Sequence, residues 1–234
     1  MPTEPPLGAR LDWTPVEPPQ RAPVQGSRIL LRPVDAITDA EPLYAISHPP
    51  DGEPAIWTYL PDGPYESPTH LGRMLAWAET AADAVYFTLV SLPDERPLGL
   101  ASYQRITAEF GVVEIGHIWF GVPLQRTTAA TEAIYLLAAH AFDDLGYRRL
   151  EWKCNALNAA SRRAAERFGF TFEGVFRNHQ VVKGRNRDTA WYAITDYDWP
   201  PIRTGFASWL APENFDQNGI QRRPLRELIA QARS

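Results

Sequence analysis

A polar segment in the middle of the chain runs directly into an amphipathic helix, and its residue types suit phosphate binding. The segment extends from Gln125 to Ala130 and follows a strand predicted over residues 113–120, whose β-branched and aromatic residues are typical of sheets. Apolar residues then recur at helical spacing as far as Leu145, and Gly146 ends the pattern. A loop of this kind presents unpaired backbone N–H groups at the positive end of a helix dipole. We therefore expect it to hold a phosphate-bearing cofactor.

The same strand-then-helix pattern occurs once more, directly afterwards. A strand is predicted over residues 147–154. Asn158 is a suitable N-cap for a helix that carries Ser161 near its start and ends at Gly169. Two successive strand–helix units favour a pair of parallel strands beside the phosphate loop.

Taken together, these segments resemble the Gcn5-related N-acetyltransferases, and more closely the branch that acetylates the N-termini of ribosomal proteins. The resemblance covers residues 27–200 and implies a mixed α/β fold. In that fold a mostly antiparallel central sheet contains a splayed parallel strand pair and is flanked by helices. The motifs that carry the resemblance are Glu114-Ile115-Gly116, Gln125-Arg126-Thr127-x-Ala129-Ala130-Thr131-Glu132-Ala133, Asn158-x-x-Ser161, Glu166-Arg167-Phe168-Gly169-Phe170, Glu173-Gly174 and Lys183-Gly184-Arg185-Asn186-Arg187-Asp188.

The resemblance implies acetyl-CoA as co-substrate and assigns residues that bind it. The strand backbone before the loop contacts the pantetheine arm, and one N–H there polarises the thioester carbonyl. Asn158 bonds the pantetheine amides. Arg126 and Thr128 stand where the family commonly has glycine. Arg126 either compensates by offering its charge to the pyrophosphate or is an ordinary exposed loop arginine. The cofactor-binding residues implied in this way are Ile118, Trp119, Phe120, Gln125, Arg126, Thr127, Thr128, Ala129, Ala130 and Asn158.

Two side chains are expected to move protons. Glu114 lies eleven positions before Gln125, where some family members place a catalytic glutamate, and a carboxylate beside an apolar cleft suits a general base. The alternative is an ordinary ion-paired or sheet-edge glutamate. Ser161 is expected to protonate the leaving thiolate, because Ala165 stands where many relatives have a tyrosine. The alternative is that Asn158 and Ser161 only cap a helix.

Other residues are given simpler roles. Strict alternation along the strand places His117 on the face opposite Glu114, as a core or interface histidine. Cys154 is expected to be a small buried apolar group. The histidines and the single cysteine show no metal-ligand spacing, so no metal is expected. Trp57, Tyr59 and Tyr103 either line the acceptor cleft or pack in the core, where aromatic residues are common.

Composition limits the class of protein. The chain has 234 residues, of which 44% are hydrophobic, enough to bury a full core. Its net charge of -5 argues against nucleic acid as a partner. A single cysteine suits a reducing compartment, and neither a signal pattern nor an apolar run of about 20 residues is found. We expect a cytoplasmic protein with no membrane partner.

The chain divides into three parts. Residues 1–26 form a proline-rich arm, because seven of the 22 prolines lie in the first 23 residues. Residues 27–200 form the acetyltransferase-like domain, with further helices predicted over 38–47 and 69–82. Its further strands are predicted over 28–34, 85–92, 98–106, 174–182 and 189–197. Residues 201–234 form a helical tail that packs on the body or on a second subunit, so a homodimer is possible.

These expectations lead to one function. The protein transfers the acetyl group of acetyl-CoA to a primary amine by direct attack in a ternary complex. The acceptor is a protein N-terminus or a small amine. The alternatives are transfer of another acyl group, such as succinyl, and a non-catalytic acyl-CoA-binding protein.

Overall fold

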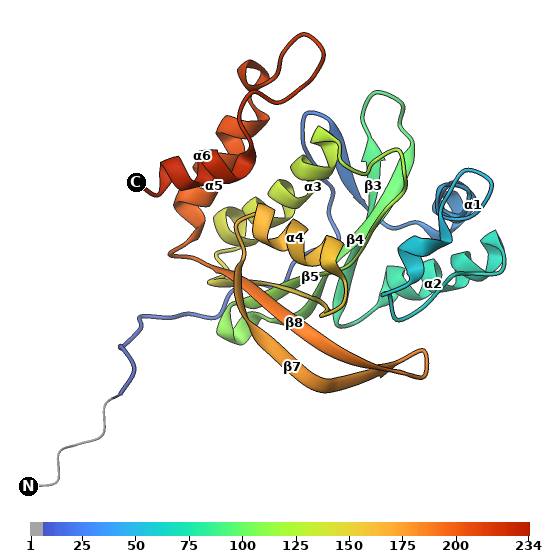
Figure 1. Ribbon diagram of the computed structural model, residues 1–234. Coiled ribbons are helices and arrows are strands. Elements are labelled where there is room, and N and C mark those ends of the chain that lie inside the picture. The colour runs from blue at the N-terminus through green and yellow to red at the C-terminus, as the bar shows by residue number, and fades with distance from the viewer. Residues whose placement is uncertain (1–6) are drawn as a thin grey trace, which may run out of the picture.

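Runs of β-branched and aromatic residues produce one eight-stranded sheet in the computed structural model, which describes residues 7–234 (Figure 1). The strand order is β1-β2-β3-β4-β5-β6-β8-β7, and only β5 and β6 are parallel neighbours. The strands are β1 (Val24–Gln25), β2 (Ile29–Pro33), β3 (Ala84–Ser91), β4 (Pro97–Thr107), β5 (Val112–Phe120), β6 (Arg149–Asn155), β7 (Thr171–Val182) and β8 (Arg185–Thr195).

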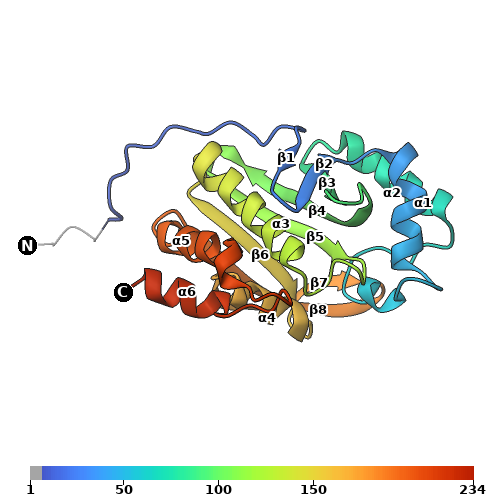
Figure 2. The same cartoon turned by 90° about the horizontal axis from the view of Figure 1, so that it is seen from above.

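Helices cover both faces of this sheet, so the protein has two apolar cores (Figure 2). Alternation along β3 shows the division: Val85 and Phe87 belong to one core, and Ala84 and Tyr86 to the other. Helices α3, α4, α5 and α6 cover the first face, and α1 and α2 cover part of the second. The helices are α1 (Ala36–Ser47), α2 (Pro68–Thr80), α3 (Thr128–Ala139), α4 (Ala159–Arg167), α5 (Trp199–Leu210) and α6 (Leu225–Ala232), with short helical turns at Pro54–Trp57, Ala108–Phe110, His140–Asp144 and Pro212–Asn214.

The parallel pair separates halfway along its length. Pairing of β5 with β6 runs from Val112 opposite Arg149 to Ile115 opposite Trp152. Beyond that point β5 continues to Phe120 and β6 to Asn155 without facing pairs. The backbone edges of both strands are therefore unpaired with each other just where β5 leads into the loop before α3.

A β-bulge on β5 accompanies this separation. Leu100 pairs with Trp119 and Ser102 with Gly116, so β5 has one residue more than β4 over the same stretch. His117 in this bulge has a positive φ of 46°, which strains a residue with a Cβ. An extra residue changes which side chains face which side of a strand. It gives Glu114 and Trp119 the same face, although strict alternation would separate them.

The carboxyl-terminal helices pack on the body of this molecule. Phe206 of α5 contacts Tyr135 of α3 and Phe168, with ring centroids 5.4 and 6.1 Å apart. Helix α6 in turn lies close against α5, because a Cβ at Gly205 would meet Ile229 at 2.5 Å. The tail thus completes the first core. This is one of the two alternatives proposed from the sequence, in which the tail packs on the body of the same molecule.

The described part of the amino-terminal arm is anchored without forming a helix. Trp13 Nε1 donates to the Glu109 carbonyl at 2.8 Å, and Val16 N donates to the Ala108 carbonyl. Further along, the buried Glu132 of α3 accepts backbone N–H groups from Ser27 and Arg28. Residues 1–6, which belong to the predicted arm, lie outside the described residues.

The predicted mixed α/β fold with a mostly antiparallel sheet and one splayed parallel pair is confirmed. The last hairpin differs from the prediction in its bounds, because β8 begins at Arg185 and not at residue 189. Asn186 already pairs with Val181, so the turn consists of Lys183 and Gly184. No helix of the described residues is long and apolar enough to cross a membrane.

Candidate active site

The loop before α3 keeps a conformation that favours glycine, although it has an arginine there. Arg126 has φ 61°, a value that costs a residue with a Cβ about 1–2 kcal/mol. Gln125 Nε2 donates to the Phe120 carbonyl at 2.9 Å and so ties the loop to the end of β5. A residue with a side chain therefore occupies the family's glycine position, and the backbone there keeps a left-handed conformation.

Three backbone N–H groups in this loop are left for a ligand. Thr127 is the N-cap of α3, and its Oγ1 accepts from Ala130 N at 3.1 Å. Within residues 7–234, the N–H groups of Arg126, Thr128 and Ala129 have no hydrogen-bond acceptor. Unpaired N–H groups at the start of a helix bind phosphate. The loop residues thus fit the pyrophosphate of a CoA molecule.

The unpaired end of β5 continues from this loop. Ile118 and Phe120 pack at the edge of the first core and are partly exposed, whereas Trp119 is buried in the second core against Trp57. Their side chains are accounted for by packing, as the sequence allowed. Their backbone lies on the separated edge of the parallel pair, where an extended pantetheine chain can approach it.

Helix α4 begins beside the separated end of β6. Asn158 caps the helix, with its Oδ1 accepting from Ser161 N at 3.0 Å. The hydroxyl of Ser161 accepts a 2.9 Å hydrogen bond from Trp152 Nε1. Because the indole uses a lone pair of the hydroxyl, the Ser161 proton stays available to another acceptor. Capping and a role at the thioester are therefore compatible for both residues.

Glu114 is buried and ion-paired. Its Oε2 lies 2.5 Å from Arg105 Nη1 and 3.0 Å from Lys153 Nζ. Lys153 also contacts Glu151 at 2.6 Å and lies 3.8 Å from the ring centroid of Trp191. These contacts match the ion-paired alternative that the sequence left open. Catalysis by Glu114 stays a prediction, and its Oε1 makes neither of these ion pairs.

A comparison with known protein families identifies the family to which this chain belongs. The model described as "Acetyltransferase (GNAT) domain" matches residues 28–171, which is more than half of the chain. The chain belongs to the GNAT acetyltransferase family.

Individual GNAT relatives agree with this assignment. The chain is 25% identical over 144 residues to a Bacillus subtilis (strain 168) protein described as "Putative ribosomal N-acetyltransferase YdaF", covering 61% of this chain and 78% of that protein. A GCN5-related N-acetyltransferase from Brucella melitensis has 41% identity and a TM-score of 0.90, covering 94% of this chain and 99% of the other.

A more distant neighbour shares the GNAT fold. It is an acetyl transferase from Salmonella typhimurium that modifies the N-terminal serine of a 50S ribosomal subunit protein, with 19% identity and a TM-score of 0.63 over 74% of this chain and 99% of that one. The resemblance to the GNAT family stated from the sequence is confirmed.

One sequence expectation about this GNAT site is wrong. His117 lies on the face that carries Glu114, because it stands within the β-bulge between Gly116 and Trp119 and has a positive φ. Its ring contacts Tyr86 of the second core at 5.5 Å, and its Nε2 lies 3.6 Å from Asp62 Oδ1. The pair was missed because Asp62 is far away in sequence and the bulge leaves no mark in the hydrophobic pattern.

The aromatic residues expected around the acceptor separate into two groups. Tyr103 and Trp57 are wrong as cleft residues, since both are fully buried. The Tyr103 hydroxyl donates to the Leu137 carbonyl beneath α3. Tyr59 is partly exposed and donates to the Leu157 carbonyl at 3.3 Å, so it bridges the loop before α2 to the segment before α4. Cys154 is buried as expected, and burial raises the pKa of its thiol.

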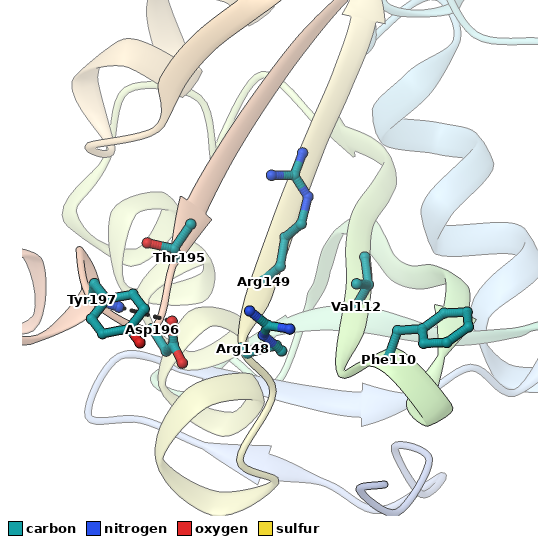
Figure 3. Close-up of a pocket in the computed structure, with 7 residues that line it drawn as sticks. All are labelled: Phe110, Val112, Arg148, Arg149, Thr195, Asp196 and Tyr197. Atoms are coloured by element: carbon teal, nitrogen blue, oxygen red, sulfur yellow. Dashed lines mark hydrogen bonds between the residues drawn. The ribbon is translucent and has the colours of Figure 1, made fainter. Parts of the chain in front are cut away.

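A surface cavity of about 470 Å³ lies at the other end of the GNAT sheet (Figure 3). It contains none of the site residues named above. Val112 and Arg149, the first residues of β5 and β6, line it, whereas the phosphate loop follows the last residue of β5. The guanidinium of Arg149 forms ion pairs with both Glu151 and Glu173. This cavity is therefore distinct from the cofactor path. Within residues 7–234 no cluster of His, Cys, Asp and Glu is suited to hold a metal.

Proposed function

We propose that this GNAT acetyltransferase uses acetyl-CoA to acetylate a primary amine by direct attack in a ternary complex. The observation that carries the proposal is a continuous path along β5. It runs from the unpaired N–H groups before α3, along the separated strand edges, to the hydroxyl of Ser161.

In this proposal acetyl-CoA is bound by backbone groups more than by side chains. The N–H groups of Arg126, Thr128 and Ala129 bind the pyrophosphate, and the Arg126 guanidinium adds charge. The edge of Ile118, Trp119 and Phe120 binds pantetheine, and an N–H of this edge polarises the thioester carbonyl. Asn158 keeps its amide nitrogen for a pantetheine carbonyl, because its Oδ1 is used for capping.

The reaction forms a C–N bond and breaks the C–S bond of the thioester. The acceptor enters as an ammonium group and must lose one proton before its nitrogen can attack. The second proton leaves nitrogen after attack and restores the hydroxyl of Ser161, which gives its own proton to the CoA thiolate. For removal of the first proton the sequence predicts Glu114. His117 is the second residue with suitable chemistry on the same face.

The acceptor in this proposal is a protein N-terminus or a small amine. The description of the Bacillus subtilis relative as a putative ribosomal N-acetyltransferase favours a protein N-terminus. The chain's net charge of -5 suits a cationic acceptor. Mass spectrometry after incubation with acetyl-CoA and either ribosomal-protein peptides or small amines would separate the two classes. Succinyl-CoA in parallel reports the acyl preference.

The phosphate loop offers a sharp test by calorimetric titration with acetyl-CoA. Thr128 is the first residue of α3 and follows Thr127, whose φ of -93° and ψ of 165° are extended, as a residue before proline must be. Thr128→Pro therefore removes one phosphate-binding N–H from a position that tolerates proline. We expect roughly tenfold weaker binding, as for a lost charge-assisted hydrogen bond.

The matched control is Thr128→Ala, which keeps the N–H and should bind acetyl-CoA like the unaltered protein. Equal affinities of the proline and alanine variants would contradict the proposed loop. Failure of the unaltered protein to bind acetyl-CoA, CoA and succinyl-CoA would contradict the proposed function as a whole.

A further inference from the structure

Two buried polar atoms face each other beside the separated strands without a hydrogen bond. His117 Nε2 and Asp62 Oδ1 lie 3.6 Å apart, and neither has a partner within residues 7–234. The His117 side chain is only 6% exposed. Buried polar atoms are normally satisfied, and exceptions occur where a site is built for a ligand or for proton transfer.

The surroundings hold Asp62 in this position. Tyr65 Oη donates to Asp62 Oδ2 at 2.5 Å, which leaves Oδ1 for the imidazole. Tyr65 is itself held, because its backbone N–H donates to His48 Nε2 at 3.0 Å. The carboxylate is thus oriented by a buried chain of hydrogen bonds and not by a flexible loop alone.

The bulge gives His117 its place at the reaction path. The strained φ of 46° turns its side chain to the face of Glu114, directly before Ile118 in the unpaired part of β5. That is the edge to which the proposed function assigns the thioester. Strain of this kind persists where a structure needs a side chain in a particular place.

We propose that His117, oriented by Asp62, accepts the proton that the acceptor amine must lose before it attacks the thioester. The inference rests on the proposed function. Asp62 Oδ1 stabilises the tautomer with the proton on Nε2, so that the lone pair lies on Nδ1. That nitrogen makes no hydrogen bond within residues 7–234.

Proton transfer from the ammonium to Nδ1 gives a free amine and an imidazolium. Asp62 stabilises this imidazolium until its proton passes to water. The products are then the amide, the CoA thiol and one released proton, so that the reaction balances.

The charged and titratable groups in this part of the molecule come from several elements. Asp62 and Tyr65 come from the loop before α2, Tyr86 from β3, and Glu114 from β5 itself. Lys183 comes from the β7–β8 turn, and its ammonium donates to the Trp57 carbonyl at 2.8 Å. Burial lowers the pKa of His117, and the charge of Asp62 opposes that shift. The imidazole is therefore neutral near neutral pH, which is the protonation state that a general base needs.

The decisive variant is His117→Asn, followed by the pH dependence of kcat/KM for the best amine found. Asparagine tolerates a positive φ, so the bulge should survive. We expect kcat/KM to fall about 100-fold, as for loss of a general base, with disappearance of the acidic limb of the profile. Acetyl-CoA affinity should not change. Asp62→Asn should keep an acidic limb but move it to lower pH.

Two controls make the result specific. His140→Asn alters a histidine at the far end of α3 and should leave the profile unchanged. The ring of His117 can also be titrated by NMR in the unaltered protein, which needs no variant to fold. Its pKa should equal that of the acidic limb of kcat/KM.

Full activity of His117→Asn with the acidic limb intact would overturn the inference and assign the proton to Glu114. A His117 pKa that differs from the kinetic limb would overturn it as well. Absence of acetyl transfer by the unaltered protein is a different outcome, since it contradicts the proposed function.

Discussion

The indole Nε1 of Trp152 donates a hydrogen bond of 2.9 Å to the hydroxyl of Ser161, and so joins β6 to the first turn of α4. This hydrogen bond from β6 fixes the rotamer of Ser161. It leaves the hydroxyl proton free to point away from the indole.

Ser161→Ala should therefore affect catalysis more than folding. We expect kcat to fall about 100-fold from loss of the proton donor, with unchanged acetyl-CoA affinity. Loss of the hydrogen bond should cost about 1 kcal/mol of unfolding free energy, measured by urea denaturation. Trp152→Phe removes the same bond but keeps the hydroxyl, and should lose stability with a much smaller loss of kcat. Equal kinetic losses in both variants would indicate a purely structural contact.

Arg126 combines a strained backbone with a useful charge, and two substitutions separate these effects. Arg126→Gly relieves a φ of 61° and should raise stability by about 1 kcal/mol. Arg126→Ala keeps the strain. Both variants lose the guanidinium, so both should bind acetyl-CoA more weakly and to a similar extent, by calorimetry. A glycine variant that binds as tightly as the unaltered protein would show that the arginine contributes no charge to the pyrophosphate.

The ion pairs of Glu114 should matter for stability whatever its kinetic role. Glu114→Gln leaves Lys153 and Arg105 without their shared carboxylate, and we expect a loss of about 3 kcal/mol in urea denaturation. The double variant Glu114→Gln with Lys153→Met should recover part of this loss, because it removes a buried ammonium that Glu114→Gln leaves with Glu151 as its remaining carboxylate partner. Additive losses in the double variant would mean that the two side chains do not interact.

Tyr147 should make the fold sensitive to alkali. Its hydroxyl is buried without a partner in the described residues, and burial raises the pKa of Tyr147 to about 12. The unfolded chain ionises this phenol near its ordinary pKa of about 10, so stability falls as pH rises through that value. Tyr147→Phe should be neutral or stabilising near pH 7 and should weaken the alkaline decline. Urea denaturation at a series of pH values from about 7 to about 11 measures both.

Local patterns were sufficient for most of the architecture. The strand before the phosphate loop, the cap Asn158 and the parallel pair follow from spacing, capping and strand–helix order. Each of these depends on neighbouring residues only. The contacts of Ser161 and Glu114, in contrast, depend on which strands lie side by side.

The remaining features could not be read from the chain because they arise from register. A single extra residue in β5 reverses the side of His117, and hydrophobic alternation contains no mark of it. The positive φ of Arg126 is equally hidden, since arginine is no signal for that backbone region. The partner of His117 lies in a loop that only folding brings near β5.

The anchoring of the arm has a practical consequence for handling the protein. Its contacts with Ala108 and Glu109 lie just before β5, while the phosphate loop comes after the end of that strand, roughly 30 Å further along by the usual rise per residue. Immobilisation on a sensor surface through the amino end should thus hold the molecule with the loop before α3 facing bulk solvent.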